Sequence, residues 1–345
     1  MGTSIREIIS KREIGFEELK GKILVVDSYN ILYQFLSSIR QMDGSLLKDS
    51  KGNITSHLSG LFSRTTRLMA YGIKLAFAFD GKPPELKLGE IERRVGLKQE
   101  AEKRFRIAEK EENLEEMKKY AARTSRLTKE MVEEAKELIA ALGCPVIQAP
   151  SEGEAEAAFI VQRGDAYAVV SEDYDSLLFA CPRMVKNLTI TARKKQKGRL
   201  SYERIEPSLI VLGDNLKEWG INQDQLIILG ILVGTDFNPG GIKGIGQKKA
   251  LKLVKEYGTE FEKLFGDLGK DYEISFDWKK VYDTIKDMPK DKDYWLVWKG
   301  INRERVKELL VERHDFSLER VESTLAKLEE DKKSREQKGL SEFLR

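Results

Sequence analysis

Four short apolar runs lie along the first half of the chain. They cover residues 22–27 (KILVVD), 74–80 (KLAFAFD), 145–148 and 167–171 (YAVVS). Their side chains are almost continuously apolar, which is typical of strands that helices cover on both faces. Amphipathic stretches at 29–40, 57–71 and 128–143 separate these runs. The pattern predicts an α/β fold in which helices flank a central, twisted, mainly parallel sheet.

The rest of the pattern is mostly helical. Residues 226–233 (LIILGILV) are apolar on every side and predict a buried helix. Ser4 and Glu7 have the spacing of a capping box, which predicts a short helix at 4–10. Residues 184–202 predict a hairpin with a basic tip, RKKQKGR. Residues 318–335 predict a last helix that becomes increasingly charged towards its end.

Residues 81–130 differ from their surroundings in charge content and in the pattern of apolar positions. This segment contains 14 basic and 11 acidic residues, so it carries the whole net charge of +3. Its apolar periodicity is weak, and helices formed here have little apolar surface to dock on a core. We therefore expect an insertion that leaves the main domain.

Composition narrows the chemistry. Hydrophobic residues make up 41% of the 345 positions, enough to bury a large core. Cys144 and Cys181 form no disulfide framework and indicate a reducing compartment. The two histidines, His57 and His314, lie far from the acidic motifs, so a metal would have oxygen ligands and would be Mg²⁺ or Mn²⁺. No run suits a membrane span or a signal peptide.

Acidic residues follow the predicted strands repeatedly. One acid at a strand end is commonly a helix cap or a solvated loop residue. Several together favour a shared crevice, because ligands of open α/β sheets bind beyond the carboxyl ends of the strands. The candidate residues are Asp27, Asp80, Glu152, Glu154, Asp173, Asp175 and Asp236. Their mutual repulsion predicts two divalent ions, which can activate a water and stabilise the leaving oxygen of a phosphodiester.

A glycine-rich stretch, GTDFNPGGIKGIGQKKAL, begins at residue 234. Gly244 and Gly246 predict a tight turn between the buried helix and a second helix that starts near Gln247. Backbone N–H groups at such a helix start suit a phosphate oxygen, and Lys243, Lys248 and Lys249 add positive charge. The stretch therefore favours a helix-hairpin-helix that holds a DNA backbone. The alternative is an ordinary glycine-rich turn.

Six segments together resemble the flap endonucleases, in particular their archaeal members. They read VVDSYNILYQF, AFAFDGKPPELK, APSEGEAEAA, SEDYDSLLF, VGTDFNPGGIKGIG and QKGLSEFL, and they span essentially the whole chain. The resemblance implies a structure-specific 5′ flap endonuclease and 5′ exonuclease of DNA replication and repair. It implies that the seven acids form a two-metal site, that residues 81–130 are a helical arch, and that the hairpin binds duplex DNA with a K⁺ ion.

The resemblance also assigns roles outside the acidic set. Lys87 and Arg94 match arch residues near the scissile phosphate, and their spacing of seven puts them on one helix face. The alternative for both is a solvated, charged helix. Tyr33 matches an aromatic residue that stacks on a substrate base. Its alternative is a core position, because apolar residues flank it.

The last residues resemble a sliding-clamp-binding peptide. Gln337 would enter a polar pocket of the clamp (PCNA), while Leu340, Phe343 and Leu344 would fill an apolar one. The usual motif ends in two aromatic residues, whereas this chain has Phe and then Leu. The alternative is the fraying end of an amphipathic helix. The long basic extension of eukaryotic relatives is missing from the sequence, which favours the cytoplasm of a prokaryotic, archaeal cell.

These interpretations combine into one organisation. A nuclease domain at 1–328 contains the arch at about 81–130 and the hairpin element at about 226–257, and a flexible tail follows at 329–345. The protein is expected to act on branched DNA with a 5′ flap and to be monomeric alone. Two alternatives stay open: a non-catalytic, clamp-tethered adaptor for DNA junctions, and a Holliday-junction-type nuclease of the same superfamily.

Overall fold

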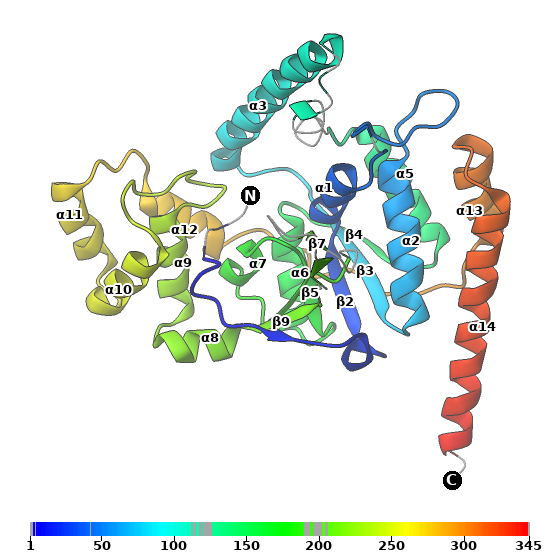
Figure 1. Cartoon of the computed structure of the whole chain (residues 1–345). Coiled ribbons are helices and arrows are strands. Elements are labelled where there is room, and N and C mark those ends of the chain that lie inside the picture. Colours follow the sequence, from blue (N-terminus) through cyan, green and yellow to red (C-terminus); the bar gives the residue numbers. More distant parts are fainter. Residues whose placement is uncertain are drawn as a thin grey trace.

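The computed structural model describes residues 3–343, apart from 4, 42, 112, 114, 117–119, 121–125, 190–193, 196–201 and 204–205. Its centre is a seven-stranded sheet in the order β1-β9-β6-β5-β2-β3-β4, with helices on both sides (Figure 1). The strands are β1 Arg12–Glu13, β2 Ile23–Asp27, β3 Lys74–Phe79, β4 Val146–Gln148, β5 Ala168–Val170, β6 Arg183–Lys186 and β9 Ser208–Val211. In this part of the chain, no helix is both long and apolar enough to cross a membrane.

The pairing confirms the mainly parallel sheet. β2 lies between β3 and β5, and both neighbours run parallel to it, as do the pairs β3–β4 and β5–β6. Only the edge formed by β9 and β1 is antiparallel. The hairpin predicted at 184–202 is wrong in its first part, because β6 belongs to the central sheet. A separate hairpin pairs β7 Lys194–Lys195 with β8 Tyr202–Glu203, and most of its basic tip lies outside the described residues.

Alternation along the strands explains the layers. Val25 and Ala76 face one buried cluster, whereas their neighbours Val26 and Phe77 face another on the opposite side of the sheet. The helices between residues 153 and 286 pack on the first side, and those at 28–38, 56–70, 129–141, 303–307 and 318–343 pack on the second. Both faces of the central strands are therefore buried, which explains why these strands are continuously apolar.

The helices agree with most sequence predictions. Their bounds are α1 Ser28–Ser38, α2 Ser56–Ala70, α3 Glu85–Lys110, α5 Lys129–Ala141, α6 Gly153–Gln162, α7 Asp175–Leu178, α8 Leu212–Trp219, α9 Gln223–Val233, α10 Gln247–Tyr257, α11 Phe261–Asp271, α12 Trp278–Lys286, α13 Arg303–Lys307 and α14 Leu318–Phe343. A 3₁₀ helix covers Phe16–Leu19 and a π-helix covers Glu308–Arg313.

Three segments need separate comment. The predicted helix at 4–10 is wrong. The described residues form only a turn at 6–8, and the backbone N–H of Thr3 donates a hydrogen bond to Asp175. α3 stands out from the rest of the molecule, as the charge of 81–130 predicts (Figure 1). α14 continues as far as Phe343, so its backbone crosses the predicted boundary at residue 329 without a break.

Candidate functional site

The carboxyl ends of four parallel strands bring the predicted acids to one edge of the sheet. Asp27 ends β2, Asp80 follows β3, and Asp173 lies in the turn between β5 and α7. The chain after β4 leads into α6, whose start carries Glu152 and Glu154, while α7 begins with Asp175 and the loop after α9 carries Asp236. We call these seven residues the acidic edge.

Hydroxyl groups tie two of these carboxylates together. The Ser171 hydroxyl donates to Glu154 over 2.7 Å, and its oxygen lies 3.3 Å from Asp27 Oδ2. The Ser176 hydroxyl lies 3.2 Å from the same oxygen of Glu154. Asp27 also accepts from the backbone N–H of Asn30, so this strand-end acid caps α1 as well as facing its neighbours.

The other acids are oriented by donors from distant parts of the chain. Asp80 accepts from the backbone N–H of Gly153 over 2.7 Å. Asp173 accepts from the Asn30 amide over 3.0 Å. The backbone N–H of Thr3 donates to Asp175 over 2.6 Å, across 172 positions of sequence. Each of these bonds fixes a carboxylate without neutralising it.

The acidic edge contains more negative charge than its surroundings compensate. Burial raises the pKa of Asp27 to about 7, with a further contribution from Asp80. Burial also raises the pKa of Glu154, assisted by repulsion from Asp27 and Asp175. The pKa values of Asp80, Glu152 and Asp175 are raised as well, and burial is the largest cause for each. Such a site attracts cations.

Two cations from α3 reach the acidic edge. The ammonium group of Lys87 pairs with Glu152 and lies 3.7 Å from Asp236, and the guanidinium of Arg94 pairs with Asp236. Burial alone would lower the pKa of Lys87, but the nearby carboxylates, led by Glu152, raise it. The alternative of a solvated, charged helix is therefore wrong for these two positions, which share one face as their spacing predicts.

The donor set fits divalent cations by its chemistry. Seven carboxylates in a partly dry crevice offer the hard oxygen ligands that Mg²⁺ and Mn²⁺ prefer. The pKa values of Asp27, Asp80, Glu152, Glu154 and Asp175 are raised, chiefly by burial, so a cation would favour their ionised forms. Among the described residues, however, no three acidic, histidine or cysteine side chains are already arranged around an ion position. Lys87 and Arg94 pair with Glu152 and Asp236, so two of the candidate ligands contact basic side chains.

The turn between α9 and α10 has the geometry expected of the hairpin. Ile242 and Ile245 are buried anchors, Gly244 adopts a φ of +90°, and α10 begins at Gln247. Gly246, the N-cap residue of α10, has no side chain that could cap the helix. Lys243 and Lys248 are exposed, and Lys249 is exposed with its ammonium group on the hydroxyl of Tyr272.

Close glycine contacts couple this turn to the acidic edge. A Cβ at Gly234 would lie 2.7 Å from the backbone nitrogen of Gly241, and Gly234 has a φ of +102°. Only glycine allows the end of α9 and the following turn to approach this closely. The loop that carries Asp236 is further fixed by Asn238, whose amide donates to the carbonyl of Ile231 over 2.8 Å.

Tyr33 lies on the surface near α3. It is 38% exposed, and the ammonium group of Lys98 lies 4.4 Å from its ring centroid. The core alternative for Tyr33 is therefore wrong. The ring lies beside α3, the helix that also carries Arg94.

A second polar region lies between α2, α5 and the turn before α14. His314 Nδ1 lies 3.0 Å from Asp49, and His314 Nε2 lies 3.1 Å from Glu134. His57 Nε2 lies 3.4 Å from the other oxygen of Glu134, an ion-pair distance without hydrogen-bond geometry. We call these four residues the histidine cluster.

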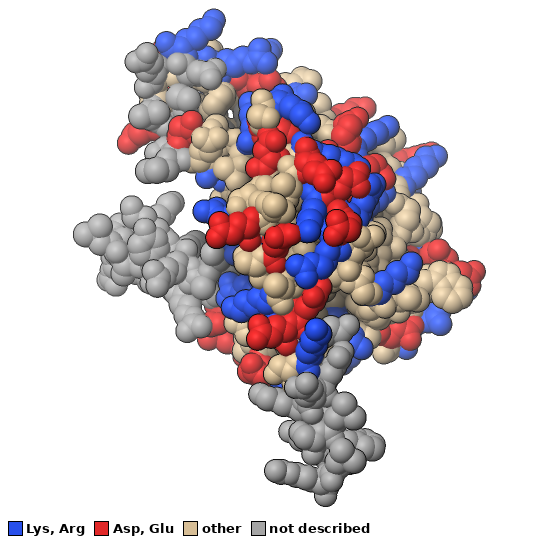
Figure 2. Space-filling model, turned by 90° about the vertical axis from the view of Figure 1, so that its right-hand side faces the viewer, with Lys and Arg blue, Asp and Glu red and all other residues tan. Residues whose placement is uncertain are grey.

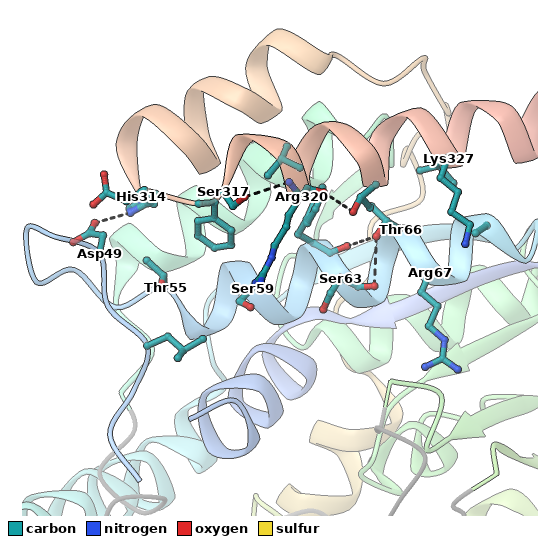
Figure 3. Close-up of a pocket in the computed structure, with 18 of the residues that line it drawn as sticks. Asp49, Thr55, Ser59, Ser63, Thr66, Arg67, His314, Ser317, Arg320 and Lys327 are labelled. Atoms are coloured by element: carbon teal, nitrogen blue, oxygen red, sulfur yellow. Dashed lines mark hydrogen bonds and ion pairs between the residues drawn. The ribbon is translucent and has the colours of Figure 1, made fainter. Parts of the chain in front are cut away.

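Asp49 and His314 of the histidine cluster line one end of a cavity of about 950 Å³. Figure 3 shows Ser59, Ser63 and Arg320 along this cavity, between α2 and α14. On the face that carries α13 and α14, acidic and basic side chains are interspersed, so neither sign dominates its visible part (Figure 2).

The remaining predicted residues belong to the tail. Gln337, Leu340 and Phe343 lie in the backbone helix of α14, with side chains outside the description, and Leu344 lies outside the described residues. Sequence reasoning missed Ser171, Asn30 and Thr3. The first two lie inside the acidic motifs and could have been noticed there. Thr3 gives no sequence signal, because only folding brings it to Asp175.

Comparison with known proteins gives a consistent result. Residues 2–101 match the XPG N-terminal domain, and residues 143–236 match the XPG I-region. Flap endonuclease 1 of Hyperthermus butylicus is 50% identical, and that of Pyrococcus furiosus is 46% identical, each over 100% of both chains. The solved structure of flap endonuclease-1 from Methanococcus jannaschii superposes with a TM-score of 0.75 at 37% identity, covering 97% of this chain and 100% of that one.

Proposed function

We propose, from the premise that this chain belongs to the flap endonuclease 1 family of metal-dependent phosphodiester hydrolases, that the acidic edge is the cleavage site and holds two Mg²⁺ ions. Mn²⁺ is a substitute. The ligands are Asp27, Asp80, Glu152, Glu154, Asp173, Asp175 and Asp236. When bound, the two ions supply an activated water and charge stabilisation at the leaving oxygen.

The meeting of α3 with the acidic edge is the observation that supports this proposal most. Lys87 and Arg94 pair with Glu152 and Asp236, which are themselves proposed ligands. A cation held by these carboxylates would compensate their charge, and Lys87 and Arg94 would then be available to a phosphate group. Both then stabilise negative charge on the scissile phosphate in the transition state.

The remaining contacts orient the DNA. We assign the uncapped start of α10, with Gly244, Gly246, Lys243, Lys248 and Lys249, to the duplex backbone, together with a K⁺ ion. Tyr33 provides a stacking face for a substrate base, and residues 81–130 form the arch through which the flap passes. The substrate is branched DNA with a 5′ flap.

The direct test compares end-labelled flap, nicked and four-way DNAs with and without Mg²⁺. We expect Mg²⁺-dependent cleavage near the base of the 5′ flap. Preferred cleavage of the four-way DNA would instead favour the Holliday-junction-type alternative. A non-catalytic adaptor no longer fits, because the family consists of nucleases.

We assign the tail residues Gln337, Leu340, Phe343 and Leu344 to the sliding clamp (PCNA) of the same cell, in the archaeal cytoplasm. The nuclease itself is a monomer. Phe343→Ala combined with Leu344→Ala removes stimulation by the clamp and leaves clamp-free cleavage unchanged. Flap cleavage is measured at matched enzyme concentration with and without clamp. Retained stimulation would contradict the assignment, and a loss of basal activity would show that the tail is structural.

A further inference from the structure

A buried lysine lies directly behind the turn that carries Asp173 and Asp175. Lys186 is the last residue of β6 and is only 7% exposed. Its ammonium group donates to the backbone carbonyl of Glu172 and lies 3.8 Å from the ring centroid of Tyr174. An ammonium group in such a place is unfavourable unless charges or hydrogen-bond acceptors compensate it. The Glu172 carbonyl and the Tyr174 ring therefore stabilise the buried charge, and Lys186 in turn holds these two residues in place.

The turn at 172–175 is anchored through Glu172 from two directions. The backbone N–H of Asn187, next to Lys186, donates to the Glu172 carboxylate over 2.7 Å. The backbone N–H of Glu172 donates to the Asn30 side chain over 3.1 Å. Asn187 adopts a φ of +60°, which is uncommon for a residue other than glycine. The end of β6 is therefore shaped to hold this turn.

Charge connects Lys186 with the acidic edge. Burial lowers the pKa of Lys186, while Glu172, Asp173 and Glu154 act in the opposite direction. Unlike Lys87 and Arg94, this cation comes from the sheet and not from α3, so binding of DNA to the α3 side need not displace it.

We propose that Lys186 is a positioning residue, a buried counter-charge that holds the Glu172–Asp175 turn in place before any divalent cation binds. The inference rests on the proposed metal site. A fixed positive charge and a bound divalent cation repel each other, so Lys186 stabilises the cation-free fold and weakens cation binding at the same time. A residue that only packed against the turn would have no such opposed effects.

The test compares Lys186→Gln with the wild type, with Lys186→Arg and with Lys22→Gln. Lys22 is a matched control, because it also lies over a tyrosine ring, 5.2 Å from the centroid of Tyr167, but is exposed and at the other end of β2 from Asp27. Mn²⁺ binding is measured by electron paramagnetic resonance. The melting temperature is measured in a chelator and again with saturating Mn²⁺.

Lys186→Gln binds Mn²⁺ roughly three- to tenfold more tightly than the wild type, because the repulsion is removed. Its melting temperature falls in chelator and recovers with Mn²⁺. Lys186→Arg restores both properties, and Lys22→Gln changes neither. Unchanged or weaker Mn²⁺ binding by Lys186→Gln would overturn the inference, as would failure of this variant to fold even with Mn²⁺. If the wild type bound no Mn²⁺, the proposed metal site itself would be wrong. This outcome is read from the wild type alone and so is distinct from a failure of the inference about Lys186.

Discussion

The acidic edge and the histidine cluster both contain buried carboxylates, but the two regions shift the pKa values of these carboxylates in opposite directions. At the acidic edge, burial and neighbouring acids raise the pKa of Asp27 to about 7. In the histidine cluster, burial also acts to raise the pKa of Asp49, but hydrogen bonds led by those from Asn53 and His314 lower it to about 2. Uncompensated carboxylates form a site that needs cations, whereas compensated carboxylates join parts of the fold.

The positions of the two regions fit this difference. The acidic edge lies where parallel strands end, the edge at which ligands of open α/β sheets bind, and α3 approaches it there. The histidine cluster links the segment before α2 to α5 and to the turn before α14, through Asp49, Glu134 and His314. Its two ends are 265 positions apart in sequence, and the link therefore closes a large part of the chain.

The largest expected effect is on the rate of cleavage, which should fall for substitutions in the acidic edge and stay unchanged for a substitution in the histidine cluster. Asp175→Ala and Asp236→Ala each remove a proposed metal ligand, and we expect each to slow cleavage by roughly a thousandfold or more. Asp49→Asn is the matched change in the histidine cluster and leaves the rate per folded molecule unchanged. Single-turnover cleavage and flap binding are measured for all three. Full activity of either ligand variant in Mg²⁺ would contradict the two-metal assignment, and flap binding should survive in both.

The second effect tests the cations of α3. Lys87→Ala and Arg94→Ala should each slow single-turnover cleavage by roughly a hundredfold, because one charge that stabilises the transition state is lost. Binding of the flap should change much less. Lys98→Ala, also on α3 but placed over Tyr33, is the control and should affect cleavage less. If the losses lie wholly in binding, Lys87 and Arg94 belong to a general basic surface.

A third prediction concerns stability and has opposite signs in the two regions. At about pH 8 in a chelator, Glu154→Gln should raise the melting temperature, because repulsion from Asp27 and Asp175 disappears. Glu134→Gln should lower it by a few degrees, because a neutral amide is a weaker hydrogen-bond acceptor for His314 Nε2 than the carboxylate. Thermal unfolding followed by circular dichroism measures both. A lower melting temperature for Glu154→Gln would contradict the predicted contrast between the two regions.

The smallest effect is the pH dependence of the histidine cluster. The pKa of Asp49 is about 2 in the folded protein and about 4 in an unfolded chain. The stability that its ionised form contributes is complete above about pH 4 and is lost as the pH falls towards about 2. Comparing melting temperatures of the wild type and Asp49→Asn across this range isolates the effect. The gap between them should narrow as the pH falls, and a constant gap would contradict the assigned pairing.

The sequence by itself determined the strands, most helices and the acidic set. Strands buried on both faces must be continuously apolar, and several of the acids follow such strands closely, so local pattern was sufficient for them. The hairpin glycines were also readable, because a left-handed turn such as that at Gly244 requires a specific residue type.

Only the tertiary structure decided which side chains meet. It placed Thr3 on Asp175, Lys186 behind Glu172, and His314 between Asp49 and Glu134. It also showed that Tyr33 is exposed and that β6 joins the central sheet. These contacts join residues that are close in space and mostly distant in sequence. Their energies depend on burial and on the neighbouring charges, which no local pattern of residues contains.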